Sequence, residues 1–238
     1  MEAKQKKSEI ELLKEALPDF IYVRHLYFLV FVPSFAEVLL SFPFPWITTM
    51  LSASRATPWG IVTGIFVHGD FLTHFLPNMA YLLAFCLLFV MSNFYHAKDT
   101  RERRSRFMFY IVLTTSVTIN IVWTYLTPRP SIGASGAVFA TEGAVLGFSS
   151  FNILPTGKTV AEVKQQYFTW RSGLFVFYNF LAFVFFVSMI FYNPAMFLGV
   201  GENVNSVEHG IGFLIALIGT ILYEYIGVIH RRTRDRKQ

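Results

Sequence analysis

The stretch Ser131-Ile132-Gly133-Ala134-Ser135-Gly136-Ala137 opens a long apolar segment, and the residues that follow it decide the fold. Small residues recur along this segment at helical spacing: Gly136, Ala140, Gly143, Ala144 and Gly147. On a helix they lie on one narrow face, where the backbone of a neighbouring helix can pack closely. Ser135 lies where this face begins. A serine in that position is either packing material or a nucleophile.

The composition is typical of a membrane protein. Of the 238 residues, 54% are hydrophobic and 15% are charged, whereas a soluble domain has about 25% charged residues. The mean hydropathy is +0.48. Apolar segments, each near the roughly 20 residues that cross a bilayer as a helix, lie at 25–45, 75–95, 107–127, 135–154, 173–192 and 207–228. We therefore predict an all-α membrane protein with a six-helix bundle at 21–230, a short N-terminal segment at 1–20 and a basic tail at 231–238.

The basic residues predict the orientation of the chain. They cluster before the first apolar segment, between the second and third, between the fourth and fifth, and after the sixth. With six crossings all these clusters fall on one side, and only Arg55 and Arg129 fall on the other. The positive-inside rule then places both termini in the cytoplasm. The expected location is the cell membrane, and the net charge of +5 does not indicate nucleic-acid binding.

Two further features of the sequence bear on the site. A long connection at 46–73 contains Trp46 and Trp59 and is expected at the lipid interface, where tryptophan is favoured. The single cysteine, Cys86, lies inside the second segment. It excludes an intrachain disulfide and is expected to be a small buried apolar residue.

Polar residues begin the second apolar segment. His74 and Asn78 are four apart, so on a helix they share a face. Pro77 lies between them, and proline is tolerated in a first helical turn but is costly further in. We therefore expect this pair at the very top of the second helix, either as a simple helix cap or as part of a site.

The sixth segment opens with Glu208-His209-Gly210-Ile211-Gly212. Gly212 and Ala216, extended by Gly219, form a face of small residues that suits the small face of the fourth segment. His209 heads this face, so close packing of the two helices brings it beside Ser135. The second, fourth and sixth segments run in the same direction, so His74, Asn78, Ser135 and His209 are expected in the same leaflet.

These residue types suit acyl transfer. A serine becomes a good nucleophile when a base takes its proton, and histidine suits that task near neutral pH. The backbone N–H of Ser135, the Asn78 amide and His74 can donate hydrogen bonds to the oxyanion of the tetrahedral intermediate. The only acid beside His209 is Glu208, whose side chain is expected to point elsewhere. The pattern therefore favours a Ser–His dyad over a triad.

The three motifs resemble those of the rhomboid family of intramembrane serine proteases. The resemblance covers the six-helix body and rests on His-x-x-x-Asn at 74–78, Gly-x-Ser-Gly at 133–136 and His-x-x-Gly at 209–212. It implies that Ser135 is the nucleophile, that His209 is the general base and that His74 and Asn78 help to form the oxyanion hole. It also implies cleavage of transmembrane or membrane-adjacent segments of other membrane proteins, without metal or cofactor.

The resemblance includes two departures and one expected ring contact. Trp59 is followed by Gly60 where many rhomboids have Trp-Arg, and Ala216 stands where the family often has glycine. Phe139, one turn after Ser135, is expected to stack under His209. The predicted helix-packing and histidine-stacking residues are Gly133, Gly136, Phe139, Gly212 and Ala216.

Two other functions stay open at this point. One is a catalytically inactive rhomboid-like protein that binds transmembrane helices. The other is a small transporter, motivated by Glu37, Glu142 and Glu224 within the apolar segments. Glu37 is expected to face other helices, and Glu142 is expected to make a structural hydrogen bond between helices. The sequence has no His-Glu-x-x-His zinc motif, and it leaves the oligomeric state open.

Overall fold

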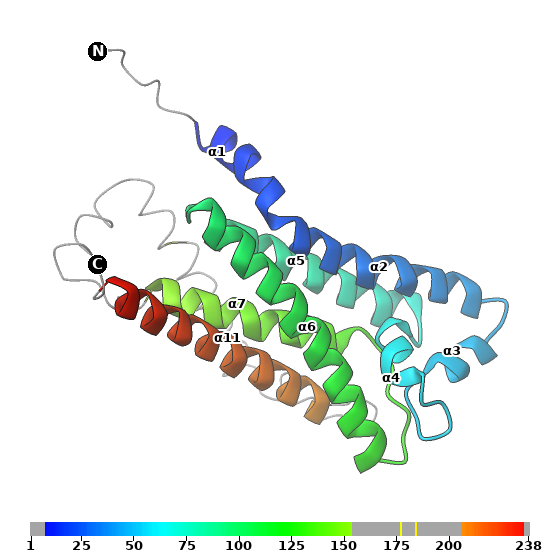
Figure 1. Cartoon of the computed structure of the whole chain (residues 1–238). Coiled ribbons are helices and arrows are strands. Elements are labelled where there is room, and N and C mark those ends of the chain that lie inside the picture. Colours follow the sequence, from blue (N-terminus) through cyan, green and yellow to red (C-terminus); the bar gives the residue numbers. More distant parts are fainter. Residues whose placement is uncertain (1–7, 154–176, 178–183, 185–205, 236–238) are drawn as a thin grey trace, which may run out of the picture.

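The computed structural model describes residues 8–153, 177, 184 and 206–235, and these residues form a bundle of helices (Figure 1). In chain order the elements are α1 (Glu9–Ala16), η1 (Leu17–Phe20), α2 (Ile21–Ser41), α3 (Trp46–Leu51), α4 (Gly60–Thr63), η2 (Gly64–Phe66), η3 (Phe71–Phe75), α5 (Leu76–Asn93), α6 (Lys98–Leu126), α7 (Ser135–Ile153) and α11 (Ser206–Asp235). The predicted segment at 173–192 lies outside the described residues, apart from 177 and 184.

The helices differ from the predicted apolar segments at their ends. α2 covers 21–41 rather than 25–45, because Pro43 and Pro45 follow and a proline has no N–H to continue the helical hydrogen bonds. α6 begins at Lys98 and so includes the basic residues that precede the apolar run predicted at 107–127. Hydropathy detects only the apolar middle of a helix whose ends extend beyond the hydrocarbon.

Four helical stretches in the described residues are long and apolar enough to cross a membrane. They are Ile10–Ser41, Phe71–Asn93, Lys98–Leu126 and Glu208–Ile229. Helix α7, predicted as a crossing at 135–154, is less apolar than these. It packs against α5, α6 and α11, and its residues 140–149 are all buried. A helix surrounded by protein has little need of an apolar surface toward lipid, so small and polar residues are accommodated there.

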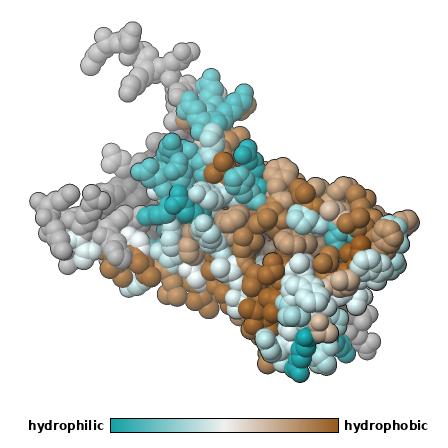
Figure 2. Space-filling model, turned by 45° about the vertical axis from the view of Figure 1, so that its right-hand side comes forward, coloured by the Kyte–Doolittle hydropathy of each residue, from teal (hydrophilic) through white to brown (hydrophobic). Residues whose placement is uncertain are grey.

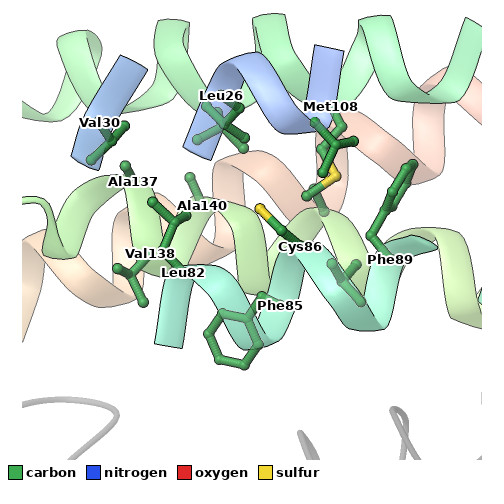
Figure 3. Packing of buried hydrophobic residues seen from close by; sticks show 14 of the residues in the cluster. Leu26, Val30, Leu82, Phe85, Cys86, Phe89, Met108, Ala137, Val138 and Ala140 are labelled. Atoms are coloured by element: carbon green, nitrogen blue, oxygen red, sulfur yellow. The ribbon is translucent and has the colours of Figure 1, made fainter. Parts of the chain in front are cut away.

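The core lies between α2, α5, α6 and α7. Figure 3 shows Leu26 and Val30 of α2 facing the small side chains of α7, with Leu82 of α5 and Met108 of α6 beside them. All four of these larger side chains are fully buried. Outside the core, large apolar side chains on α2, α5 and α11 are exposed, and Figure 2 shows this apolar surface lying between more hydrophilic regions. Such a surface is suited to contact with lipid.

Helices α7 and α11 pack through glycine. A Cβ atom added to Gly143 would lie 2.2 Å from the carbonyl oxygen of Phe213, and one added to Gly147 would lie 2.8 Å from Cβ of Thr220. The two backbones are therefore in direct contact, as small-residue packing requires. Ala216 is fully buried in this part of the bundle. The expectation for Gly219 was wrong, because its nearest neighbour is the Ile111 side chain of α6, at 3.0 Å from an added Cβ.

Buried charges lie near the end of the bundle where α6 begins. Arg104 of α6 donates through Nε and Nη2 to the carboxylate of Glu224 of α11, both at 2.9 Å. Its Nη1 donates to Oδ1 of Asn93 of α5 and of Asn152 of α7, both at 2.7 Å. One guanidinium therefore joins four helices, and each of its buried donors has an acceptor.

The other two buried carboxyl groups differ from each other. Glu37 of α2 is buried as expected and accepts hydrogen bonds from the Thr48 hydroxyl and the His68 N–H, both at 3.0 Å. The interhelical hydrogen bond expected for Glu142 is not made, because its Oε1 is buried with no partner in the part of the chain that the structure describes. The helix neighbours of Glu142 are mostly small or apolar, which leaves few donors within its reach.

Helix α1 and the last turn of α11 lie at the same end of the bundle as the start of α6, while α3 and α4 lie at the opposite end (Figure 1). Part of the predicted N-terminal segment packs on the bundle. Ala16, Asp19 and Phe20 are buried, and Asp19 accepts a hydrogen bond from Nε of Arg101 at 2.8 Å.

The connection between α2 and α5 is fastened to its neighbours by hydrogen bonds. Trp46 and Trp59 are both exposed, and Nε1 of Trp59 donates to the Met50 carbonyl at 2.7 Å. Arg55 donates to the carbonyls of Thr124 and Tyr125 at the end of α6, at 3.2 and 2.7 Å. A basic side chain at a helix C-terminus satisfies carbonyls that have no partner within the helix. Arg55 therefore anchors the connection, although no arginine follows Trp59.

Gly60 is required by its surroundings. A Cβ atom there would lie 2.0 Å from the carbonyl oxygen of Ser52. A larger residue after Trp59 would push α4 away from the chain at 52–53. The departure from Trp-Arg is thus compensated by a close backbone contact.

Candidate active site

The loop that leads into α7 is held by backbone hydrogen bonds. Ser131 and Ala53 exchange N–H···O bonds at 2.9 Å, and the Gly133 N–H donates to the Gly64 carbonyl at 2.9 Å. Gly133 has φ of +116°, a conformation that glycine adopts without strain. After this turn the Ala134 carbonyl accepts the first helical hydrogen bond of α7, and Ser135 is the first residue of the helix.

His74 occupies the space that a side chain at position 133 would need. A Cβ atom on Gly133 would lie 2.6 Å from Nε2 of His74 and 3.6 Å from Oγ of Ser135. The absence of a side chain at 133 therefore leaves space for the His74 ring, and the Ser135 hydroxyl lies beside the same space. Glycine is required here twice, by its backbone angle and by this contact.

The proton on His74 can be assigned from its hydrogen bond. The Gly69 N–H donates to Nδ1 of His74 at 3.0 Å, so Nδ1 is the acceptor. In a neutral imidazole the other nitrogen then carries the hydrogen. Nε2 of His74 is accordingly a donor, and it points toward Gly133 and Ser135.

The helix that carries His74 and Asn78 begins with a π-helical turn. Residues Phe71–Phe75 form this turn, and the Phe75 N–H donates to the Asp70 carbonyl at 3.0 Å. Pro77 lacks an N–H, and its ring disfavours a close carbonyl in the preceding turn, so a wider turn relieves both problems. Asp70 caps this start by accepting from the Thr73 N–H at 2.6 Å. The pair thus lies near the helix start as expected, but spans the junction of the π-turn and α5.

Asn78 has an open donor. Its Nδ2 is buried and has no hydrogen-bond partner among residues 8–153 and 206–235. Buried amide groups are nearly always hydrogen-bonded, so an unpartnered one needs an explanation. A donor held ready for a bound carbonyl oxygen would explain it.

His209 is positioned by α7 and α11 together. Its ring stacks on Phe139, with ring centroids 4.3 Å apart and an interplanar angle of 16°. Phe139 lies one turn after Ser135 on α7, so this stack places His209 beside the helical turn that Ser135 begins. One turn below His209, a Cβ on Gly212 would lie 2.6 Å from the Ile119 side chain and 3.6 Å from the Gly136 carbonyl oxygen.

The His209 ring is buried, and within the described ranges its Nδ1 has no hydrogen-bond partner. No hydrogen bond joins Ser135 to His209 in the described part of the chain either. Such bonds are often long before substrate binds and tighten in the Michaelis complex. Over the same ranges, no group of three His, Cys, Asp or Glu side chains is arranged to hold a metal ion.

Glu208 points away from the His209 ring. It accepts a hydrogen bond from the Ser131 hydroxyl at 3.1 Å, and the same hydroxyl lies 3.1 Å from Oδ1 of Asn120. Asn120 in turn donates to the Ile61 carbonyl at 2.9 Å. Glu208 therefore ties the first turn of α11 to the loop that precedes Ser135.

A comparison with models of protein families shows the family of this chain. A family model described as Rhomboid domain matches residues 55–225. The chain belongs to the rhomboid family. The matched region includes His74, Asn78, Ser135 and His209, so every predicted reacting residue lies inside the rhomboid domain. Searches of curated proteins and of solved structures found no match.

Sequence reasoning missed several positioning residues of this rhomboid domain. Arg55, Asp70, His68 and Glu208 each fix a segment next to the site. The sequence could have pointed to Arg55, because it is one of only two basic residues expected on its side of the membrane. The signal for His68 was its place six residues before His74. Its ring lies 5.0 Å from the His74 ring, centroid to centroid, and its Nδ1 lies 3.0 Å from the Phe66 carbonyl oxygen.

Proposed function

We propose that this chain is an intramembrane serine endopeptidase that cleaves peptide bonds in or near transmembrane segments of other membrane proteins. The observation that carries the proposal is the stack of His209 on Phe139, one turn after Ser135, because it brings a potential base to the helical turn that begins with the serine. Membership of the rhomboid family supports the same reaction class.

In the proposed reaction, Oγ of Ser135 attacks the substrate carbonyl carbon and Nε2 of His209 takes the hydroxyl proton. The Ser135 N–H, Nε2 of His74 and Nδ2 of Asn78 donate to the resulting oxyanion. His209 then protonates the leaving amine as the peptide C–N bond breaks. A water molecule hydrolyses the acyl-enzyme by the same route, with His209 again as the base. The chemistry uses a dyad, with no acid on Nδ1 of His209.

We further propose six crossings in a multi-pass protein of the cell membrane, with both termini in the cytoplasm. The membrane domain spans 21–230, preceded by the segment 1–20 and followed by the basic tail 231–238. Support comes from the basic residues at the start of α6 and in the last turn of α11, which lie at one end of the bundle, while Arg55 lies in the connection at the other end. By the positive-inside rule, the more basic end faces the cytoplasm.

Transport is less well supported. Two of the three carboxyl groups that motivate it already have partners, since Glu37 binds Thr48 and the His68 N–H, and Glu224 binds Arg104. A carboxyl group with fixed partners is poorly suited to bind and release a solute or a proton.

Cleavage of a single-span substrate by the purified protein in liposomes tests the proposal. Ser135→Ala is expected to lower the rate by at least about 10³-fold, as loss of a nucleophile does. Asn78→Ala is expected to lower it by about 10²–10³-fold through loss of one oxyanion donor. Ser150→Ala is the matched control, because the Ser150 hydroxyl donates to the Leu146 carbonyl of its own helix, at 2.8 Å.

A fluorophosphonate probe gives a second readout that does not depend on the substrate. We expect labelling at Ser135 that His209→Ala strongly reduces and Ser150→Ala leaves unchanged. Wild-type cleavage by Ser135→Ala would show that the nucleophile is wrongly assigned. Loss of cleavage with full labelling in His209→Ala would show that His209 is not the base.

A further inference from the structure

A groove opens on the side of the bundle away from the candidate active site. It lies where α1, η1 and the first turns of α2 meet the last half of α5, and its volume is about 610 Å³. That volume is in the range of small-molecule sites, about 300–1,000 Å³. Its lining is almost entirely apolar and includes Leu17, Phe28, Leu83 and Leu87, which are each about half exposed.

The groove exists because the chain bends between α1 and α2. α1 ends at Ala16, and the short turn η1 contains Pro18, which cannot donate a helical hydrogen bond. Farther along, α2 packs into the core through Leu26 and Val30, which are both fully buried (Figure 3). The opening therefore faces outward, and its surface matches the apolar surroundings of a bilayer.

Two basic side chains complete the groove. Lys14 of α1 and Arg24 of α2 both line it, and both residues are exposed. In the described part of the chain neither makes an ion pair. The nearby Asp19 is occupied by Arg101. The groove thus combines an apolar channel with two cations that have no acidic partner among the described residues, at the end of the bundle where other basic residues gather.

We propose that this groove binds one anionic glycerophospholipid. An acyl chain lies along Leu83 and Leu87, and the phosphate lies between Lys14 and Arg24. Long basic side chains extend their charged ends toward the headgroup region while their stems cover apolar surface. Anionic headgroups attract basic residues at the membrane surface. The proposal is independent of whether Ser135 is a nucleophile.

The alternative occupant is the chain's own first segment, residues 1–7. This segment has the sequence Met-Glu-Ala-Lys-Gln-Lys-Lys, with three lysines and one glutamate. Its net positive charge is repelled by Lys14 and Arg24, and it has too few apolar side chains to fill the groove. Charge and hydropathy therefore both favour the lipid.

Native mass spectrometry of the full chain in mild detergent tests this. The probes are dioleoylphosphatidylglycerol and dioleoylphosphatidylcholine, which share acyl chains and differ in net charge. We expect one tightly retained phosphatidylglycerol. The variant Lys14→Gln/Arg24→Gln is expected to lower the affinity for it by roughly tenfold. Leu87→Trp is expected to lower retention of both lipids, because the larger ring blocks the channel.

Matched controls separate binding in the groove from general effects. Lys98→Gln/Arg103→Gln removes the same charge at the same end of the bundle and is expected to leave phosphatidylglycerol binding unchanged. Leu222→Trp enlarges a side chain of similar exposure on α11, at 53% against 56% for Leu87. Equal retention of both lipids by the wild type, or equal effects of the groove and control variants, would overturn the proposal. So would a gain in lipid affinity on deletion of residues 1–7, since that segment would then be the occupant.

Discussion

The α7–α11 interface and the α2–α5 junction are both helix contacts in one bundle, but they are built in opposite ways. Between α7 and α11, glycines bring backbone onto backbone, and there is no space for one added carbon at Gly143. At the start of α2, the bend after α1 leaves a groove of about 610 Å³ that is lined by large side chains. The first contact fixes atoms in place, which a reacting pair needs. The second leaves space for a molecule from the bilayer.

The largest effect on the close contact between α7 and α11 is expected from Gly143→Val. The added Cβ would meet the Phe213 carbonyl oxygen at 2.2 Å, and a backbone atom cannot move aside as a side chain can. The helices must separate, so we expect loss of cleavage and a destabilisation of about 3 kcal/mol or more. Thermal unfolding in detergent measures it. Gly210→Ala is the control, because a Cβ there meets no described atom within 4 Å. A wild-type melting temperature for Gly143→Val would refute the tight contact.

The next largest effect is expected from Arg104, which joins α7 and α11 at the end of the bundle where α6 begins. Arg104→Met leaves Glu224, 3% exposed, without its cation. Removing one partner of a buried ion pair costs about 3–5 kcal/mol, mainly because the remaining charge is uncompensated. The double variant Arg104→Met/Glu224→Leu should recover most of this loss in the same unfolding assay. If it is no more stable than the single variant, the uncompensated carboxylate is not the cause.

A smaller effect, and one that depends on pH, is expected from His68. Burial, together with the neighbouring His74, lowers the pKa of His68 from 6.5 to about 4. The unfolded chain therefore takes up a proton between these pH values that the folded chain does not bind. This contribution to stability is fully present above pH 6.5 and is lost as the pH falls toward 4, up to about 3 kcal/mol.

His68→Asn removes this titration. Its melting temperature should fall less than that of the wild type between pH 6.5 and 4.5. An identical pH profile for the two proteins would show that His68 is not buried as a neutral ring.

The smallest effect is expected from Leu83→Ala on the groove side of α5, with Leu82→Ala as its buried counterpart. Leu82 and Leu83 are neighbours on α5, but Leu82 is fully buried and Leu83 is 41% exposed on the groove. Without added phospholipid, Leu82→Ala is expected to cost about 2–5 kcal/mol, and Leu83→Ala under about 1 kcal/mol. Similar losses of stability for both variants would mean that Leu83 packs against protein and that the groove is not open.

The sequence predicted the family and the small-residue packing of α7. These features depend on spacing within one helix or on residue type. Gly219 shows where such reasoning fails. Small residues three and four apart share a face, but α6 also packs against α11, so a Cβ added to Gly212 or Gly219 meets an isoleucine side chain of α6 first. Which neighbour a glycine meets depends on crossing geometry, which spacing alone does not specify.

The sequence predicted the individual residues of the candidate site, but not the hydrogen bonds that hold the neighbouring segments in place. Glu208 was expected to point away from the histidine, and it does, but its bond to Ser131 depends on a loop that only the folded chain brings near. Arg55 likewise reaches carbonyls about 70 residues further along the chain. Hydrogen bonds to backbone carbonyls have no side-chain partner in the sequence and so leave no motif to recognise.

The π-turn at Phe71–Phe75 absorbs one more residue than an α-turn of the same rise. It lies above Leu76, so the helix below keeps its rotation and the same side chains continue to face the lipid. Insertion or deletion of one residue near 67–72 can therefore be accommodated by interconversion of wide and regular turns. The position of the polar residues at the start of this helix therefore does not determine which side chains of its membrane-embedded part face the lipid.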